Sequence, residues 1–132
     1  MSTDQGNKEA TYTLDILPDS QIALFHWSGP ITLTDREQNR RIMAEFCKRH
    51  GVRNIIVDGR DQVSKTGIFD SFYFAQGVPR EMHGLRIAVV HRSDDEALPF
   101  IEMVASNRGS HTRAFLNFDE ARAWLESLDA PS

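Results

Sequence analysis

Two short apolar runs restrict the fold of this chain more than any other feature of its sequence. They are RNIIVDG at residues 53–59 and LRIAVVH at residues 85–91. Each is rich in Ile and Val and bounded by polar residues, which is typical of a strand buried on both faces. Residues 60–84 separate them, enough chain for a helical crossover. The pair therefore predicts a parallel sheet with helices packed against it.

The other periodic segments complete an alternating order. Apolar and polar residues alternate at 11–17 and 21–27, and the short turn PDS between them predicts an antiparallel pair. TRAFL at 112–116 predicts a further strand. Helical periodicity predicts four helices, at 34–50, 67–78, 95–109 and 117–128. The expected fold class is α/β, a mixed and mostly parallel sheet in the order β-β-α-β-α-β-α-β-α.

Local signals predict where these helices begin and end. Thr34 and Glu37 have the spacing of a capping box, and Gly51 is suited to a left-handed cap at the end of the same helix. Asn117 is suited to cap the last helix. The apolar stripes that should face the sheet are Ile42, Met43, Phe46 and Cys47 in the first helix, and Ala121, Trp124, Leu125 and Leu128 in the last.

Length and charge limit the class of protein. With 132 residues the chain suits one domain, expected at 11–129, after a flexible N-terminal arm at 1–10. The net charge of −4 argues against a nucleic-acid partner. Basic residues do gather between Arg36 and Arg49, but acidic residues are interleaved with them, as on a solvated helix face.

Cysteine content and hydropathy point to the cytoplasm. Cys47 is the single cysteine, so the chain has no internal disulfide and no thiolate zinc site, and its position in an apolar stripe predicts a core residue. No apolar run reaches the length of a membrane span, and the polar N-terminus is unlike a signal peptide. We expect a cytoplasmic protein without a transmembrane segment.

Charged residues follow the predicted parallel strands at their carboxyl ends, where open α/β sheets bind ligands. Asp58, Arg60 and Asp61 follow one strand, and His91 and Arg92 follow another. If the strands are neighbours, Asp58 and His91 could meet as an acid–base pair. The simpler interpretation is that strand ends emerge into water and carry charge for that reason.

The stretch from Gly59 to Thr66 comes close to a phosphate-binding loop. Lys65 and Thr66 have the spacing of the motif G-x-x-x-x-G-K-[ST], but Ser64 replaces its second glycine and Asp61 adds a negative charge. We therefore interpret the stretch as a strand-to-helix connection and expect no nucleotide cofactor. The five histidines, His26, His50, His83, His91 and His111, lack metal-ligand spacing, so no metal is expected.

The predicted helix at 67–78 is unusually aromatic. Phe69, Phe72, Tyr73 and Phe74 cannot all face the sheet, because adjacent helical residues are turned by about 100°. Tyr73 or Phe74 should therefore face outward. Exposed apolar surface of this kind indicates a protein interface or an apolar ligand pocket, and a homodimer contact is the favoured use.

From about Tyr12 to Leu128 the chain resembles the SpoIIAA-like domains, the group that contains STAS and Sec14-type α/β proteins. The residues that carry the resemblance are NIIVDGRD, LRIAVV, SNRG and AFLNFDEARAWL. The resemblance implies binding rather than catalysis, and in anti-sigma-factor antagonists of this group a serine in a turn after the central strand is phosphorylated. Here that turn resembles SKTG, with Lys65 in place of the serine, so Ser64 and Thr66 are the remaining candidate phosphoacceptors.

The sequence thus favours a non-catalytic regulatory or interaction module that acts as a homodimer. Its alternatives are a carrier of a small apolar molecule or lipid and, in third place, an enzyme that uses Asp58 and His91. No cofactor is expected. The residues expected on the ligand or partner surface are Asp58, Arg60, Asp61, Lys65, Thr66, Phe69, Tyr73, Phe74, His91 and Arg92.

Overall fold

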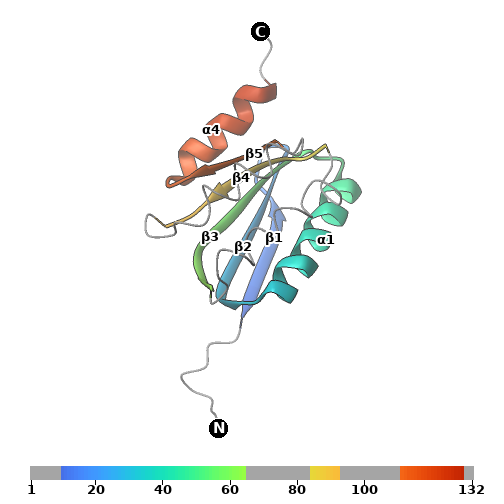
Figure 1. Ribbon diagram of the computed structural model, residues 1–132. Coiled ribbons are helices and arrows are strands. Elements are labelled where there is room, and N and C mark those ends of the chain that lie inside the picture. Colours follow the sequence, from blue (N-terminus) through green and yellow to red (C-terminus); the bar gives the residue numbers. More distant parts are fainter. Residues whose placement is uncertain (1–9, 65–83, 93–110, 130–132) are drawn as a thin grey trace.

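The computed structural model describes residues 10–64, 84–92 and 111–129 of the chain. Within them lie five strands and two helices (Figure 1): β1 (Thr11–Ile16), β2 (Ile22–Ile31), α1 (Leu33–His50), β3 (Asn54–Ser64), β4 (Arg86–Val90), β5 (His111–Phe115) and α4 (Phe118–Asp129). The helices predicted at 67–78 and 95–109 lie outside the described residues.

The strands form one sheet in the order β1-β2-β3-β4-β5. β1 is antiparallel to β2, and each later strand is parallel to its neighbour. This confirms the mixed, mostly parallel sheet expected from the sequence. Because β2 to β5 run the same way, their carboxyl ends lie along one edge, which we call the carboxyl edge.

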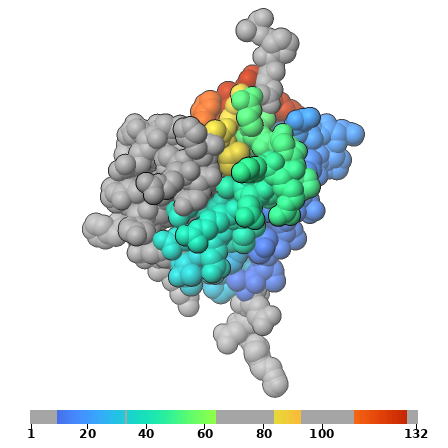
Figure 2. Space-filling view, turned by 90° about the vertical axis from the view of Figure 1, so that its right-hand side faces the viewer, coloured from blue at the N-terminus to red at the C-terminus, as the bar shows by residue number. Residues whose placement is uncertain are grey.

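The two helices pack on opposite faces of the sheet (Figure 1). Met43 and Cys47 of α1 form one core cluster with Phe25 and Trp27 of β2, on what we call the α1 face. Figure 2 looks onto this side, with α1 in cyan to green and β1 in blue. Ala121 and Leu125 of α4 form a second cluster, together with Ile22, Ile56, Ala88 and Val90, on the α4 face.

The centre of the sheet is buried as the two apolar runs predicted. Ile55 and Ile56 point to opposite faces and are both 0% exposed. Cys47 is also fully buried, and burial raises the pKa of its thiol to about 11. This confirms the expectation that Cys47 is a core residue.

β2 and β3 are longer than predicted. The sequence prediction ended them near Trp27 and Gly59, yet they pair until Ile31 lies opposite Ser64. Pro30 is tolerated because β1 begins at Thr11, opposite Ser28, so among the described strands only β3 pairs with this part of β2. The connection expected after Gly59 is therefore strand up to Ser64.

The start of α1 was predicted wrongly. Thr32, not Thr34, is the N-cap: its Oγ1 accepts from the Asp35 amide at 3.1 Å, and Asp35 Oδ2 accepts from the Thr32 amide at 2.9 Å. The helix begins earlier because β2 runs up to Ile31 and leaves no intervening loop. The predicted cap at Gly51 is confirmed by its left-handed φ of 67°.

The C-terminal helix agrees with the sequence. Asn117 Oδ1 accepts from the Glu120 amide at 3.0 Å, as the cap prediction required. The predicted stripe of Ala121, Trp124, Leu125 and Leu128 packs in or against the second core cluster. Neither α1 nor α4 is both long and apolar enough to span a membrane.

Candidate functional site

A β-bulge at the carboxyl edge organises the candidate site. His26 pairs with Asp58 and Ser28 pairs with Asp61, so two steps along β2 match three along β3. Side chains alternate between faces along a regular strand, and residues three apart would then point in opposite directions. The extra residue in β3 instead places Asp58 and Asp61 both on the α4 face, beside His26.

Asp58 holds Arg60 in a fixed position. The Arg60 side chain donates from Nε to Asp58 Oδ1 at 2.9 Å and from Nη2 to Asp58 Oδ2 at 2.8 Å. The Arg60 amide also donates to Asp58 Oδ1, at 3.1 Å. The Asp58 side chain is 9% exposed and that of Arg60 is 44% exposed, so a buried carboxylate anchors a guanidinium that reaches the surface.

Asp61 is held by a residue from the neighbouring strand. His26 Nε2 lies 2.7 Å from Asp61 Oδ2. An ionised carboxylate can only accept, so in this contact Nε2 carries the proton. The two side chains are 30% and 63% exposed, so this pair faces solvent more than the Asp58–Arg60 pair does.

The electrostatic environment keeps Asp58 ionised. Burial by itself would raise the pKa of this carboxyl, but the hydrogen bonds and positive charge of Arg60, with a smaller effect of His26, lower it below its ordinary value. Asp58 is thus a permanent anion near neutral pH. Such a group orients a cation well, and it is poorly suited to hold and release a proton during a reaction.

Apolar side chains are also exposed toward this edge. Val63, on the same face of β3 as Asp61, is 47% exposed, and Leu116, directly after β5, is 57% exposed. Tyr12 is 45% exposed and lies opposite Trp27 near the same end of the sheet. Exposed apolar groups beside fixed charges are typical of interaction sites. We call His26, Asp58, Arg60, Asp61 and Val63 the carboxyl-edge surface.

The second predicted strand-end group does not join this surface. His91 continues β4 by donating its amide to Phe115 O at 2.9 Å, and its Nδ1 lies 2.8 Å from Arg92 O. Val90 lies opposite Asp58, so alternation along β4 directs His91 to the other face, where it is buried. Asp58 and His91 therefore do not lie together as the enzyme hypothesis required; Arg92 is exposed beside His91.

The stretch that resembles a phosphate-binding loop is largely strand. Gly59 to Ser64 belongs to β3: Asp61 to Ser64 pair with β2, and the Arg60 amide donates to Asp58 Oδ1, so the stretch is extended strand and not a loop wrapped around a phosphate. A Cβ on Gly59 would approach the Gln62 side chain to 3.1 Å, so the bulge leaves little space for a side chain at this position. Ser64 is the last residue of β3, and Lys65, Thr66, Phe69, Tyr73 and Phe74 lie outside the described residues.

Metal binding finds no support in the part of the chain that the structure describes. There, no group of three or more His, Cys, Asp or Glu side chains could hold a metal ion. The acidic residues of the carboxyl-edge surface are instead engaged with Arg60 and His26.

Sequence reasoning missed two members of this surface. His26 was grouped with scattered histidines, and Val63 was placed in a connection. A signal for the bulge was present in Gly59, since an isolated glycine in a strand pattern often marks one. The partner of Asp61 depends on the register between β2 and β3, which no local pattern encodes.

Comparison with known proteins identifies the fold. No family model matches the chain, and no curated protein matches it. One similar solved structure is an uncharacterised protein of the DUF3478 family with a SpoIIAA-like fold, from Shewanella loihica PV-4. It has a TM-score of 0.55 and 17% sequence identity over 95% of this chain and 98% of the other.

A second similar structure is the anti-sigma factor antagonist SpoIIAA in its unphosphorylated form. It has a TM-score of 0.56 and 13% identity over 88% of this chain and 98% of the other. The chain therefore has a SpoIIAA-like α/β fold, as its sequence resemblance implied. At these identities the likeness defines the fold and leaves function to be argued from the site.

Proposed function

We propose that this protein is a cytoplasmic regulatory or protein-interaction module that works by binding, without catalysis, and that it associates as a homodimer through the carboxyl-edge surface. The observation that carries the proposal is the ion pair between Asp58 and Arg60. It fixes a half-exposed guanidinium in place with a buried carboxylate. A group fixed in advance loses less conformational entropy when it meets a partner.

The charges of the surface support binding more than chemistry. Asp58 and Arg60 neutralise each other, and Asp61 is engaged by His26. An enzyme would need a group able to exchange protons near neutral pH, and the lowered pKa of Asp58 works against that role. The positions of Asp58 and His91 on opposite faces of the sheet also argue against a joint acid–base role.

The composition of the surface suits self-association. A twofold interface brings one patch onto its own copy, so the patch must contain groups that complement each other. The carboxyl-edge surface offers a guanidinium at Arg60, a carboxylate at Asp61 that is 63% exposed, and an exposed apolar side chain at Val63. Arg60 of one copy can therefore meet Asp61 of the other around a centre of Val63 side chains.

The regulatory part of the proposal draws on the fold. One protein with a similar fold is an anti-sigma factor antagonist, which acts on another protein rather than on a small substrate. In this chain Lys65 takes the position expected for a phosphorylated serine, so we propose a switch that does not depend on phosphorylation there. Ser64 and Thr66 remain the candidate phosphoacceptors, and intact-mass analysis of the protein from its native host would reveal phosphate on either.

Analytical ultracentrifugation tests the homodimer. We expect wild type to sediment as a dimer at micromolar concentration and Val63→Glu to shift the equilibrium toward monomer, because it buries a charge at the centre of the contact. Arg113→Glu on β5, an exposed charge reversal outside the surface, is the control and should leave the dimer intact. A wild-type chain that stays monomeric at all concentrations would refute the homodimer.

Carriage of an apolar small molecule is the alternative proposal. It depends on the aromatic segment at 67–78, which lies outside the described residues. Native mass spectrometry of freshly purified protein separates the two ideas, because a carrier should retain a bound lipid-sized mass and an interaction module should not.

A further inference from the structure

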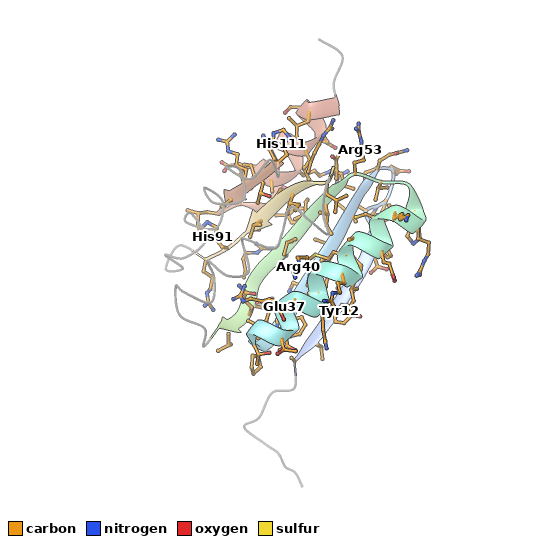
Figure 3. All side chains as sticks on the ribbon, turned by 45° about the vertical axis from the view of Figure 1, so that its right-hand side comes forward. Tyr12, Glu37, Arg40, Arg53, His91 and His111 are labelled. Atoms are coloured by element: carbon orange, nitrogen blue, oxygen red, sulfur yellow. The ribbon has the colours of Figure 1, made fainter. Side chains whose placement is uncertain are left out.

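A second surface lies at the opposite edge of the sheet. A groove of about 530 Å³ runs between the C-terminal half of α1 and the residues that precede β3 and β4. Its floor is apolar and is made by Ala44, Val52 and Leu85. In Figure 2 the segment 84–92, in yellow, lies beside the green end of α1. Figure 3 shows Arg53, from the rim, well above Tyr12, toward the opposite end of the strands.

The rim of this groove is basic although the chain as a whole is acidic. Arg41, Lys48 and Arg53 line it and are all exposed, against a net charge of −4 for the chain. The one carboxylate in the lining, Glu45, lies 3.9 Å from Arg49 and is thereby partly neutralised. Within the described residues, the side chains of these three rim residues take part in no ion pair or hydrogen bond, although the Lys48 and Arg53 carbonyls accept from the Gly51 and Arg86 amides.

The spacing of the rim cations specifies an extended ligand. Arg41 and Lys48 are seven residues apart on α1, so they lie on the same side of the helix, about 10.5 Å apart along its axis. A ligand with a single anionic group would have to draw both long side chains toward one point. An amphipathic peptide helix can contact both where they stand, because acidic residues two turns apart have the same separation and its apolar side can cover the floor.

We propose that this groove binds an acidic amphipathic peptide segment of a partner protein. Apolar side chains of the segment pack on Ala44, Val52 and Leu85, and its carboxylates pair with Arg41, Lys48 and Arg53. The site is independent of the carboxyl-edge surface, since it lies at the other end of the strands. A homodimer joined through the carboxyl-edge surface would leave two such grooves open, so one protein could bring two partner segments together.

Selection from a peptide library tests the proposal. A random 16-residue display library is selected on the full chain and counter-selected on the double variant Arg41→Glu/Lys48→Glu. We expect the enriched peptides to combine acidic and apolar residues at helical spacing. In amide chemical-shift mapping, the most enriched peptide should perturb Ala44, Lys48, Arg53 and Leu85, and leave Arg60 and Asp61 unchanged.

Affinity measurements by fluorescence anisotropy then give the contribution of the rim charges to the affinity for the selected peptide. Each exposed ion pair contributes up to about fivefold in affinity, so the double reversal should weaken binding by about tenfold or more. Raising the salt concentration from 0.05 M to 0.5 M should weaken wild-type binding and have little effect on the variant. Arg113→Glu, a charge reversal on β5 outside the groove, is the matched control and should bind as wild type does.

Several results would overturn the inference. They are a library without acidic enrichment, shift changes away from the groove, or equal affinity for wild type and the double variant. Binding to vesicles of phosphatidylglycerol through the same residues, without peptide binding, would assign the groove to a membrane surface instead. The dimer measured by ultracentrifugation does not depend on any of these outcomes, so the two proposals fail separately.

Discussion

Replacement of Asp58 by Asn tests whether this carboxylate is what holds Arg60 in position. The change keeps the size of the side chain and one acceptor oxygen but removes the negative charge. Three hydrogen bonds from Arg60 are affected: those from Nε at 2.9 Å, from Nη2 at 2.8 Å and from the amide at 3.1 Å. We expect Asp58→Asn to be less stable than wild type at neutral pH and to present a mobile Arg60.

The magnitude follows from the burial of the two partners. A hydrogen bond to a charged group contributes about 1.5–3 kcal/mol when both partners are buried. Arg60 is 44% exposed and recovers much of its hydration when the pair is lost, and Asn retains part of the acceptor function. The expected loss is therefore about 1–2 kcal/mol in the free energy of unfolding.

The effect should depend on pH in a defined direction. The folded-state pKa of Asp58 is lower than its unfolded value, so its contribution is full above the unfolded pKa, about 4, and is lost as the pH falls through the folded pKa. Urea denaturation should therefore give the same difference between wild type and Asp58→Asn at pH 7 and pH 5, and a smaller one at pH 3.

A double-mutant cycle with Arg60→Ala completes the test. If the two side chains act as a pair, the cycle should give a coupling energy of about 1 kcal/mol at pH 7. Asp61→Asn, at a largely exposed carboxylate, is the control and should cost no more than about 0.5 kcal/mol. A coupling energy of zero, or a difference that grows as the pH falls from 5 to 3, would refute the reasoning.

Three further predictions concern the fold. Thr32→Ala should destabilise the protein by about 1 kcal/mol in urea denaturation, because it removes the N-cap of α1, whereas Thr34→Ala should change stability little; equal effects would contradict the capping box. Leu125→Ala should cost about 2–5 kcal/mol, measured by thermal or urea unfolding, because Leu125 of α4 is 0% exposed and packs on the sheet; a loss under 1 kcal/mol would mean that α4 is not docked on the sheet. Cys47, fully buried and with its pKa raised to about 11, should react with a thiol reagent at pH 8 only after denaturation; rapid labelling of the native protein would contradict its core position.

The local signals in the sequence were strong where burial and backbone geometry act over a few residues. The runs around Ile55 and Ile87 identified the central strands. A strand that is buried on both faces is apolar at consecutive positions, which gives a continuous apolar run in the sequence. Gly51 and Asn117 marked helix ends correctly, since a left-handed φ and an exposed amide each favour particular residues. These features need no knowledge of distant parts of the chain.

Errors arose where two distant segments stabilise each other. The extension of β2 through Gly29 and Pro30 was missed, and the strand was expected to end at Trp27, because its strand conformation there depends on pairing with β3. The cap at Thr34 was wrong for the same reason, since the end of β2 fixes where α1 can begin. Local preference amounts to a few tenths of a kcal/mol to about 1 kcal/mol per residue, and pairing with a neighbouring strand outweighs it.

The sequence by itself determined the α/β class, the order of the strands and helices described, and the burial of the apolar runs, because these depend on hydrophobic periodicity along the chain. The tertiary structure alone decided which polar residues meet. One extra residue in β3 relative to β2 turns Asp58 and Asp61 to the same face and brings Asp61 to His26, 35 positions away in the chain. A shift of register by one residue reverses the direction of every side chain beyond it, so the surface proposed here depends on a pairing between strands that no single stretch of sequence contains.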